Sequence, residues 1–249
     1  MMVADWEIKR DEAVKILKAI EPKDGYYLAF SGGKDSCVIK ALADMAGVKY
    51  DAHYAVSGID PPELVRFIRD VHPDVKRETN YPPMFSALPV NGFPIRHGRW
   101  CCRLYKEAGG QGRIVITGVR RDESNNRADR EMLSWWNKKL MFNPIINWNE
   151  GDVWEFIKAH DIPYCSLYDE GFDRLGCIGC PLQSAHIKRK ELDRWPGFEK
   201  AYRIAFNKLY ANRMESNSNA VRHWANGDEM FDWWISNKSL SDAVQGRLF

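Results

Sequence analysis

The 249-residue sequence lacks a long apolar run, a secretory leader and an excess of charge of either sign. No hydrophobic stretch approaches the roughly 20 residues that a membrane-spanning helix needs. Residues 1–12 are charged from the outset, which does not fit a leader. Lysine and arginine number 36 and acidic residues 34, for a net charge of +2. Because this balance gives no electrostatic indication of a nucleic acid or membrane partner, we expect a cytoplasmic protein without a membrane partner.

Cysteine is sparse, and no cysteine follows Cys180. In a reducing compartment the set favours metal or redox chemistry over disulfide bonds. Two of the six, Cys37 and Cys165, fit as ordinary buried residues. The other four are Cys101, Cys102, Cys177 and Cys180.

Up to residue 182 the chain alternates between segments typical of helices and of strands. A helix is predicted over 5–20, and an apolar strand over 26–30 follows it. This alternation predicts an α/β fold with a doubly wound, mostly parallel sheet, in which ligands bind at the carboxyl ends of the strands. Further strands are predicted at 49–56, 75–79, 113–118 and 140–145.

After residue 182 the pattern becomes helical. Helices are predicted near 198–214 and 228–235, and no strand is evident. We therefore expect a first domain over 1–182, which carries the motifs described below, and a helical C-terminal extension over 183–249.

A glycine-rich turn, residues 31–36 (S-G-G-K-D-S), joins the first strand to the next helix. Its glycines let the backbone approach an anion closely, because a Cβ atom would block that approach. The backbone N–H groups, the helix dipole and the Lys34 ammonium together favour a pyrophosphate group. Ser31 and Ser36 add hydroxyl donors, and Asp35 suits the first helical turn.

The spacing of this turn excludes a Walker loop, whose G-x-x-x-x-G-K-[ST] pattern is absent. The turn resembles instead the loop of the ATP pyrophosphatases that form the PP-loop superfamily, and we call residues 31–36 the PP-loop. The resemblance implies an adenine nucleotide ligand. The alternative is a glycine-rich turn without a ligand.

A second polar segment, residues 118–127, directly follows a predicted strand. It begins with Gly118 and contains Arg120, Arg121 and Arg127. One guanidinium group can donate two parallel hydrogen bonds to phosphate or sulfate oxygens. The position of the segment after a strand places these arginines on the ligand side of the sheet. We interpret this arginine loop as an anion-binding element. The alternative is a solvated polar loop.

Four of the cysteines form a pattern typical of a metal site. Cys177 and Cys180 make a C-x-x-C knuckle, and Cys101 and Cys102 are adjacent. Four thiolates suit tetrahedral zinc or an iron–sulfur cluster. Adjacent cysteines reach one ion poorly because successive side chains diverge, whereas a four-iron cube offers corners further apart. We therefore favour a [4Fe–4S] cluster over zinc, and over four buried thiols without metal.

Taken in order, the motifs of residues 26–182 resemble the phosphoadenosine phosphosulfate (PAPS) reductase family. The series is far more specific than any single motif in it. After the PP-loop and the arginine loop it continues with 143–145 (N-P-I), 152–157 (D-V-W-E-F-I), 162–164 (I-P-Y), 167–172 (L-Y-D-E-G-F) and 176–181 (G-C-I-G-C-P).

The cysteine arrangement is similar to that of the cluster-bearing members, the adenylylsulfate reductases and the DNA phosphorothioation sulfurtransferase. The resemblance implies an adenine nucleotide alpha hydrolase-like fold. It implies that Ser57 and Gly58, after the second strand, hold the adenosine, and that Arg120 and Arg127 face the phosphates or the transferable group. Residues 57–64 look closer to the phosphorothioation branch than to the reductases.

One feature of the reductases is missing. They attack sulfur with a cysteine near the C-terminus, in a Glu-Cys-Gly-Leu-His-type tail. Here no cysteine follows Cys180, and residues 244–249 read V-Q-G-R-L-F. The thiolate that the reaction requires is absent from its expected place.

We favour an enzyme that cleaves ATP between the α- and β-phosphates, activates an acceptor by adenylation and uses the cluster to hold or deliver sulfur. One alternative is a sulfonucleotide (adenylylsulfate or PAPS) reductase whose nucleophile is Cys165 or comes from a partner. The other is a non-enzymatic, nucleotide-gated module with a structural zinc.

The favoured function implies ATP, Mg²⁺ and a [4Fe–4S] cluster, with a sulfur-donor protein or an acceptor as partner. A homodimer is compatible with the sequence, and a nucleic acid contact through the basic run 188–190 is the weaker interpretation of that run. The expected catalytic residues are Lys34, Asp35, Arg120 and Arg127. The expected nucleotide-binding residues are Ser31, Gly32, Gly33, Lys34, Asp35, Ser36, Ser57, Gly58, Gly118 and Arg120.

Overall fold

The computed structural model describes residues 4–216, 219–221 and 223–238. Its contacts divide the chain into two compact units, which we name the sheet unit and the helical unit. The sheet unit comprises Met1–Ala55, Pro62–Glu78 and Ala108–Leu175, and the helical unit comprises Val56–Pro61, Thr79–Glu107 and Gly176–Phe249. Compactness alone does not define a domain, so the domain boundary expected after residue 182 stays a prediction.

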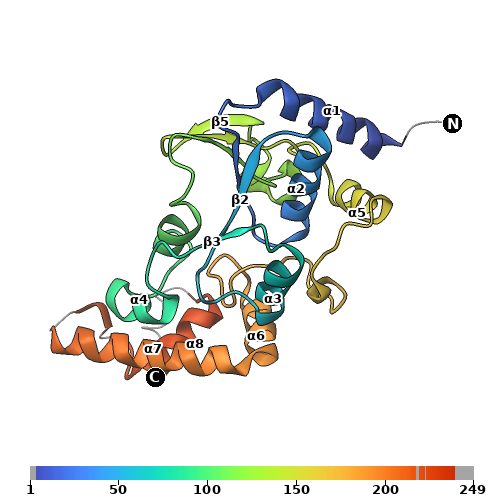
Figure 1. Ribbon diagram of the computed structural model, residues 1–249. Helices are drawn as coiled ribbons and strands as arrows, with labels where there is room; N and C mark the ends of the chain where they lie inside the picture. Colours follow the sequence, from blue (N-terminus) through green and yellow to red (C-terminus); the bar gives the residue numbers. More distant parts are fainter. Residues whose placement is uncertain (1–3, 217–218, 222, 239–249) are drawn as a thin grey trace. The chain divides into compact units, whose positions relative to one another are not determined.

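The sheet unit is built on a six-stranded sheet with the order β3-β2-β1-β4-β6-β5 (Figure 1). All neighbouring strands are parallel except β5 and β6, which are antiparallel. The predicted mostly parallel α/β fold is therefore confirmed. The strands are β1 (Tyr26–Ala29), β2 (Tyr50–Ala55), β3 (Lys76–Glu78), β4 (Ile114–Ile116), β5 (Leu133–Trp136) and β6 (Lys139–Phe142).

The antiparallel edge strand β5 was not predicted, and the strand predicted at 140–145 is shorter than expected. Strands β5 and β6 form a hairpin whose two turn residues, Asn137 and Lys138, both have positive φ angles, 47° and 61°. A two-residue turn of this kind matches the twist of the flanking strands. The sequence signal was weak because lysine, rather than glycine, occupies the second turn position.

Helices α1, α2 and α5 pack against one another beside the sheet, as Figure 1 shows. The Tyr26 hydroxyl of β1 donates a 2.8 Å hydrogen bond to the Leu17 carbonyl of α1, which fixes that helix on the strand. Helix α2 ends at Gly47, whose left-handed conformation forms the C-cap. The helices of this unit are α1 (Asp5–Ile20), α2 (Lys34–Ala46), α3 (Pro62–Val71) and α5 (Glu150–Ala159).

Strand order reverses between β1 and β4. In the sheet, β2 and β3 lie on one side of β1, and β6 and β5 lie on the far side of β4. The segments that leave the carboxyl ends of β1 and β4 therefore lie next to each other, at the position where ligands bind in doubly wound sheets. These segments are the PP-loop and the arginine loop.

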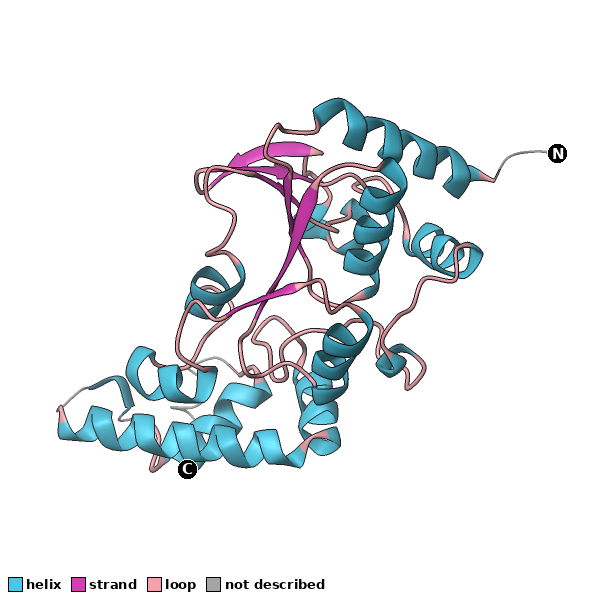
Figure 2. Cartoon of the chain, in the orientation of Figure 1, coloured by secondary structure: helices cyan, strands magenta, loops and turns pink. Residues whose placement is uncertain are grey.

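The described residues of the helical unit form helices and irregular segments, while all six strands belong to the sheet unit (Figure 2). Aromatic side chains fill its core: the Phe93 and Phe206 rings stack at 5.6 Å, and the Trp234 indole donates to the Pro94 carbonyl at 2.7 Å. Its α-helices are α4 (Met84–Asn91), α6 (Ala185–Arg194), α7 (Pro196–Glu215) and α8 (Gly227–Ser236).

The helices predicted at 198–214 and 228–235 correspond to α7 and α8. The terminal residues 239–249, including the tail 244–249, lie outside the described part of the chain. Every helix among the described residues is too short or too polar to serve as a membrane span.

The basic run 188–190 in α6 is not a continuous charged surface. Lys188 is fully buried, and its ammonium donates to the Trp234 carbonyl and to Asn237 Oδ1, both at 2.7 Å. Arg189 forms an ion pair with Asp193 at 2.9 Å. Lys188 thus anchors α8 rather than facing a partner, which removes the main support for a nucleic acid contact at this run.

We expect Gly118→Ala to lower the free energy of unfolding by about 1–3 kcal/mol, the usual cost of overpacking. A Cβ atom at this position would lie 2.9 Å from the backbone carbon and oxygen of Asp35, at the start of α2. Urea unfolding measures the change. Gly197→Ala is the control, because its Cβ atom would meet nothing within 4 Å. Equal stability of the Gly118→Ala and wild-type proteins would contradict the close contact.

Candidate nucleotide site and cysteine cluster

The PP-loop turns sharply from β1 into α2. Gly32 has a φ of +74°, a conformation that favours glycine, and a Cβ atom there would come within 2.8 Å of the side chains of Leu64 and Ile68 in α3. Gly33 is extended and forms the N-cap of α2. The first N–H groups of a helix have no partner within the helix. The turn therefore presents backbone donors at the carboxyl end of β1, as the sequence predicts.

The serines of the PP-loop stabilise this turn. The Ser36 hydroxyl donates to the Gly33 carbonyl at 2.8 Å and lies 3.3 Å from the Ser31 hydroxyl. The Gly33 N–H group points to the Ser31 hydroxyl at 3.4 Å. Both hydroxyls therefore stabilise the loop, and their expected contact with an anion stays a prediction.

Lys34 begins α2 and is almost completely buried, with 4% of its surface exposed. Its ammonium donates to the Asp173 carbonyl at 2.9 Å and lies 3.4 Å from Glu150 Oε1. It also lies 5.2 Å from the centre of the Tyr168 ring. The Lys34 N–H group donates to the Tyr168 hydroxyl at 2.9 Å. Among the described residues, Glu150 is the one carboxylate that forms an ion pair with Lys34.

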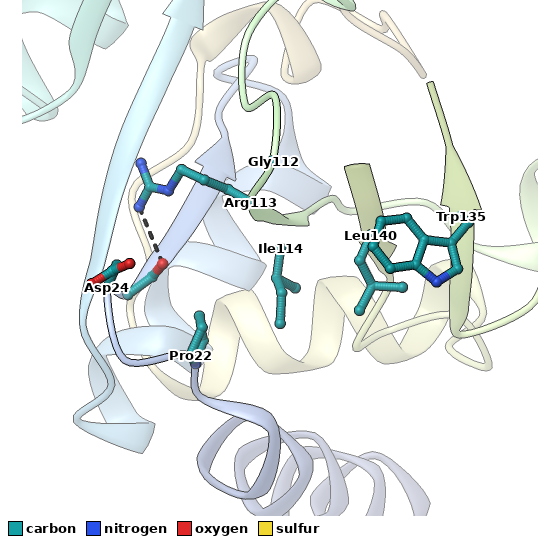
Figure 3. A pocket seen from close by; sticks show the side chains of 8 residues that line it. Pro22, Asp24, Gly112, Arg113, Ile114, Trp135 and Leu140 are labelled. Carbon is teal, nitrogen blue, oxygen red and sulfur yellow. Dashed lines mark hydrogen bonds between the residues drawn. The ribbon is translucent and has the colours of Figure 1, made fainter. Parts of the chain in front are cut away.

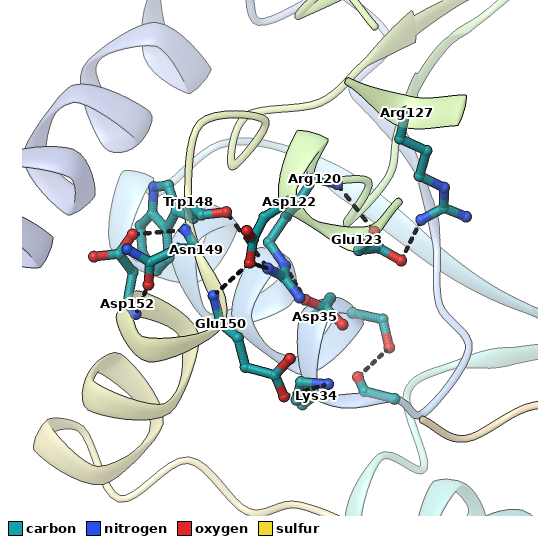
Figure 4. A network of polar contacts seen from close by, with 12 residues as sticks. Lys34, Asp35, Arg120, Asp122, Glu123, Arg127, Trp148, Asn149, Glu150 and Asp152 are labelled. Carbon is teal, nitrogen blue, oxygen red and sulfur yellow. Dashed lines mark hydrogen bonds and ion pairs between the residues drawn. The ribbon is translucent and has the colours of Figure 1, made fainter. Parts of the chain in front are cut away.

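Arg120 connects the arginine loop to the PP-loop (Figure 4). Its side chain is 2% exposed, and its Nε donates to Asp35 Oδ1 at 2.6 Å. Nη1 lies 3.4 Å from both Asp122 Oδ2 and the Trp148 carbonyl. Burial would lower the pKa of Arg120, but the charge and hydrogen bond of Asp35 offset it, and the pKa lies above its usual value.

Arg127 lies further along the same loop and forms an ion pair with Glu123 (Figure 4). Glu123 in turn accepts a hydrogen bond from the Arg120 N–H group at 3.0 Å. The arginine loop is therefore cross-linked by its own acidic residues. Whether Arg120 and Arg127 face a phosphate group, as the resemblance implies, stays a prediction.

The structure brings together Lys34, Asp35, Gly118 and Arg120, which the sequence analysis singled out from two separate motifs. It adds three residues whose contact with Lys34 was not foreseen: Glu150, Tyr168 and Asp173. Tyr168 belongs to the motif 167–172, but no spacing rule indicates that a hydroxyl more than 100 residues away reaches the PP-loop.

In the helical unit, Cys101 and Cys102 lie at the start of a single π-helical turn, Cys102–Lys106. The Glu107 N–H group closes this turn by donating to the Cys102 carbonyl at 2.9 Å. Isolated π-turns are rare and occur frequently at functional sites.

The C-x-x-C knuckle forms a tight loop. The Cys180 N–H group donates to the Cys177 carbonyl at 3.2 Å, and Gly179 between them has a φ of +72°. The Gly179 N–H group is held by Glu191 of α6 at 2.8 Å. The geometry orients both thiols from one short, glycine-dependent turn.

The cysteines of the helical unit interact with one another and with basic groups. A hydrogen bond with Cys101 lowers the pKa of Cys102, and Lys106 and Arg99 act in the same direction. Burial raises the pKa of Cys177 to about 12, which the Lys106 ammonium partly offsets. Arg99 Nη1 lies 3.7 Å from Cys102 Sγ. The surroundings therefore favour the thiolate form at Cys102.

The cysteines of the helical unit offer four thiols as donors, and the metal they would hold stays a prediction. Among the described residues, no three histidine, cysteine, aspartate or glutamate side chains are arranged to hold one metal ion. Zinc needs its four ligands about 2.0–2.3 Å from one centre, whereas a four-iron cube takes thiolates that are further apart. Four thiolates are ligands of iron–sulfur clusters and also of structural zinc sites, so the preference for a cluster stays a prediction.

Ser57 and Gly58 lie in the helical unit, close to the cysteines. The Ser57 hydroxyl donates to Asp60 Oδ2 at 2.8 Å and lies 3.9 Å from Cys177 Sγ. Gly58 has a φ of +79°. Their expected contact with adenosine stays a prediction.

A separate pocket of about 160 Å³ lies at the amino ends of β1 and β4 (Figure 3). Arg113 beside it is held by the Tyr26 carbonyl at 2.9 Å. The pocket is at the opposite end of these strands from the PP-loop, so it is not part of the candidate nucleotide site. Its lining residues are Pro22, Asp24, Gly25, Gly112, Arg113, Ile114, Trp135 and Leu140.

Curated proteins with similar sequences include adenosine 5'-phosphosulfate reductase of Staphylococcus haemolyticus. It is 34% identical over 178 residues, which are 65% of this chain and 70% of the relative. Phosphoadenosine 5'-phosphosulfate reductase of Gloeobacter violaceus is 26% identical over 80% of this chain and 89% of its own length. The matches to three other curated relatives cover only 36–44% of the relatives' own length.

A similar solved structure is the phosphoadenylyl-sulfate (PAPS) reductase of Candida auris. The TM-score is 0.52 at 16% sequence identity, and the match covers 71% of this chain and 97% of the other. At this identity the likeness supports the fold alone. The profile of the phosphoadenosine phosphosulfate reductase domain matches residues 25–183, well over half of the sequence. The chain therefore belongs to the phosphoadenosine phosphosulfate reductase domain family.

Proposed function

We propose that the protein binds ATP at the PP-loop, cleaves it between the α- and β-phosphates and thereby activates an acceptor for sulfur transfer. The observation that carries this proposal is the position of Lys34. The nearly buried Lys34 ammonium and the N-terminus of α2 follow a turn in which Gly32 has a positive φ, a conformation that favours glycine. Membership of a family named for nucleotide substrates supports the same ligand class.

The proposed chemistry relies on charge that is fixed before the substrate arrives. As the bond between the α- and β-phosphates breaks, negative charge builds on the departing pyrophosphate. Once the phosphates are bound, Lys34 and the N–H groups of the PP-loop stabilise that charge from positions that the fold sets. Arg120 keeps the PP-loop and the arginine loop together through Asp35.

Asp35 is the carboxylate that we propose for Mg²⁺. It uses Oδ1 for Arg120, so its charge is already largely balanced. Mg²⁺ in such sites keeps several waters and is held by one or two carboxylates and by the substrate phosphates. Asp35 fits the role of a single supporting carboxylate, acting directly or through a water. When bound, Mg²⁺ would neutralise phosphate charge.

The four cysteines of the helical unit are the proposed ligands of a [4Fe–4S] cluster. A bound cluster would supply a place for sulfur to bind before transfer. Lys106, whose pKa is raised chiefly by the charge of Cys177, balances the thiolates on one side. Arg99 approaches Cys102 from the same segment. These two cations fit an anionic group better than four neutral thiols.

A sulfonucleotide reductase is the second candidate, because curated relatives carry that name. This candidate requires a nucleophilic thiolate, for which Cys165 was the expected residue within the chain. Cys165 is 1% exposed, and burial raises its pKa. Attack on sulfur needs an accessible thiolate, which Cys165 does not offer. A reductase activity would therefore need a thiol from a partner.

We expect Lys34→Ala to weaken ATP binding on the order of 10- to 100-fold and to abolish pyrophosphate release. The loss corresponds to one charge-assisted hydrogen bond. Isothermal titration with ATP and a pyrophosphate-release assay measure the two effects. Lys40→Ala is the matched control, because Lys40 lies in the same helix but pairs with Asp74 at 3.1 Å. Unchanged ATP binding by the Lys34→Ala protein would refute the proposed site.

We expect anaerobically purified wild-type protein to be brown and to contain about four iron atoms per chain with matching sulfide. Cys177→Ser should lose most of that iron, because it removes a proposed ligand. Cys165→Ala is the control and should keep the iron, since Cys165 lies in the sheet unit. Colourless protein with one zinc per chain would contradict the cluster and leave the cysteines with a structural role.

A further inference from the structure

One backbone N–H group of the PP-loop, that of Lys34, already has the Tyr168 hydroxyl as its hydrogen-bond acceptor. Tyr168 ends the short helical turn Ser166–Tyr168, and its hydroxyl accepts the Lys34 N–H group at 2.9 Å. The same hydroxyl lies over Gly33, where an added Cβ atom would be 3.4 Å from it. A backbone N–H at the first position of α2 is a group that an anion bound at this loop would use.

The segment that carries Tyr168 also holds the Lys34 side chain. The ammonium donates to the Asp173 carbonyl at 2.9 Å and rests 5.2 Å from the centre of the Tyr168 ring. One stretch, residues 166–173, thus contacts both the backbone donor and the ammonium of one lysine. Every one of these contacts lies within the sheet unit.

The Tyr168 ring is held in place by neighbours rather than by the PP-loop alone. It packs edge-on against Trp154 of α5 at 5.3 Å and near the Tyr164 ring at 6.3 Å. Leu167 beside it is fully buried. The hydroxyl is therefore positioned by a packed cluster, and it stays neutral because burial raises the pKa of Tyr168 above its usual value.

We propose that the Tyr168 hydroxyl is an internal ligand of the PP-loop, which takes the place of a phosphate oxygen until a phosphate-bearing nucleotide displaces it. The inference rests on the proposed nucleotide site and adds a residue that determines which ligands enter. Tyr168 acts through the loop and is a positioning residue, not a catalytic one.

The exchange favours anions for a simple reason. The hydrogen bond from Lys34 to a neutral hydroxyl is an ordinary one, whereas a bond to a phosphate oxygen is charge-assisted and roughly twice as strong. A phosphate group therefore gains from displacing the hydroxyl. A neutral nucleoside would lose one hydrogen bond and replace it with at best an equal one, so the hydroxyl acts against ligands without phosphate.

Tyr168→Phe tests the inference, because it keeps the ring and removes only the acceptor. With the competing hydroxyl gone, inorganic pyrophosphate and ATP should bind about two- to tenfold more tightly than to wild type, the equivalent of one ordinary hydrogen bond. The Lys34 amide should exchange with deuterium faster in the free variant, as NMR can measure. Tyr164→Phe is the matched control: its hydroxyl donates to Asp169 Oδ1 at 3.1 Å, away from the PP-loop.

The direction of the change in affinity for pyrophosphate and ATP decides whether the inference holds. Weaker binding by Tyr168→Phe would show that the hydroxyl contacts the nucleotide and would overturn the inference. Equal binding, with an equally protected Lys34 amide, would also overturn it. If no variant binds pyrophosphate or ATP, both the proposed function and the inference fail. If wild type binds and Lys34→Ala does not, the proposed nucleotide site stands whatever Tyr168→Phe does.

Discussion

The parallel pairing of β1 with β4 is the constraint on which the candidate nucleotide site depends. Tyr27 pairs with Val115 and Leu28 with Ile116, so the two strands end at the same edge of the sheet. The turn after β1 supplies backbone donors and Lys34, and the loop after β4 supplies Arg120. The ion pair between the buried Arg120 and the partly exposed Asp35 then fixes one loop on the other. Removing Asp35 would leave a buried guanidinium without its 2.6 Å partner, which is costly.

Much of this arrangement could be predicted from the sequence, because it depends on local signals. Apolar strands followed by helices predicted the parallel sheet, and two glycines before Lys34 predicted a sharp turn from strand to helix. The edge strand β5 escaped prediction because its turn, Asn137 and Lys138, lacks the glycine that usually marks a hairpin.

The partners of the site residues could not be predicted, because they come from distant segments. Lys34 meets Tyr168 and Asp173, and Arg120 meets the Trp148 carbonyl. Such contacts depend on how α5 and the following segment pack on the sheet, which no spacing rule encodes. The cysteines show the same limit: two short motifs predicted a metal site, whereas the π-turn at Cys102–Lys106 and the placement of Lys106 beside Cys177 became evident only in three dimensions.

The central claim is that the PP-loop holds the phosphates of an adenine nucleotide. A crystal structure of the protein with a non-hydrolysable ATP analogue and Mg²⁺ tests it most directly. The account predicts phosphate oxygens within hydrogen-bond distance of the Lys34 N–H group and ammonium, with the Tyr168 hydroxyl displaced from the Lys34 N–H group. An analogue bound elsewhere, with the PP-loop contacts of Tyr168 and Asp173 unchanged, would contradict it.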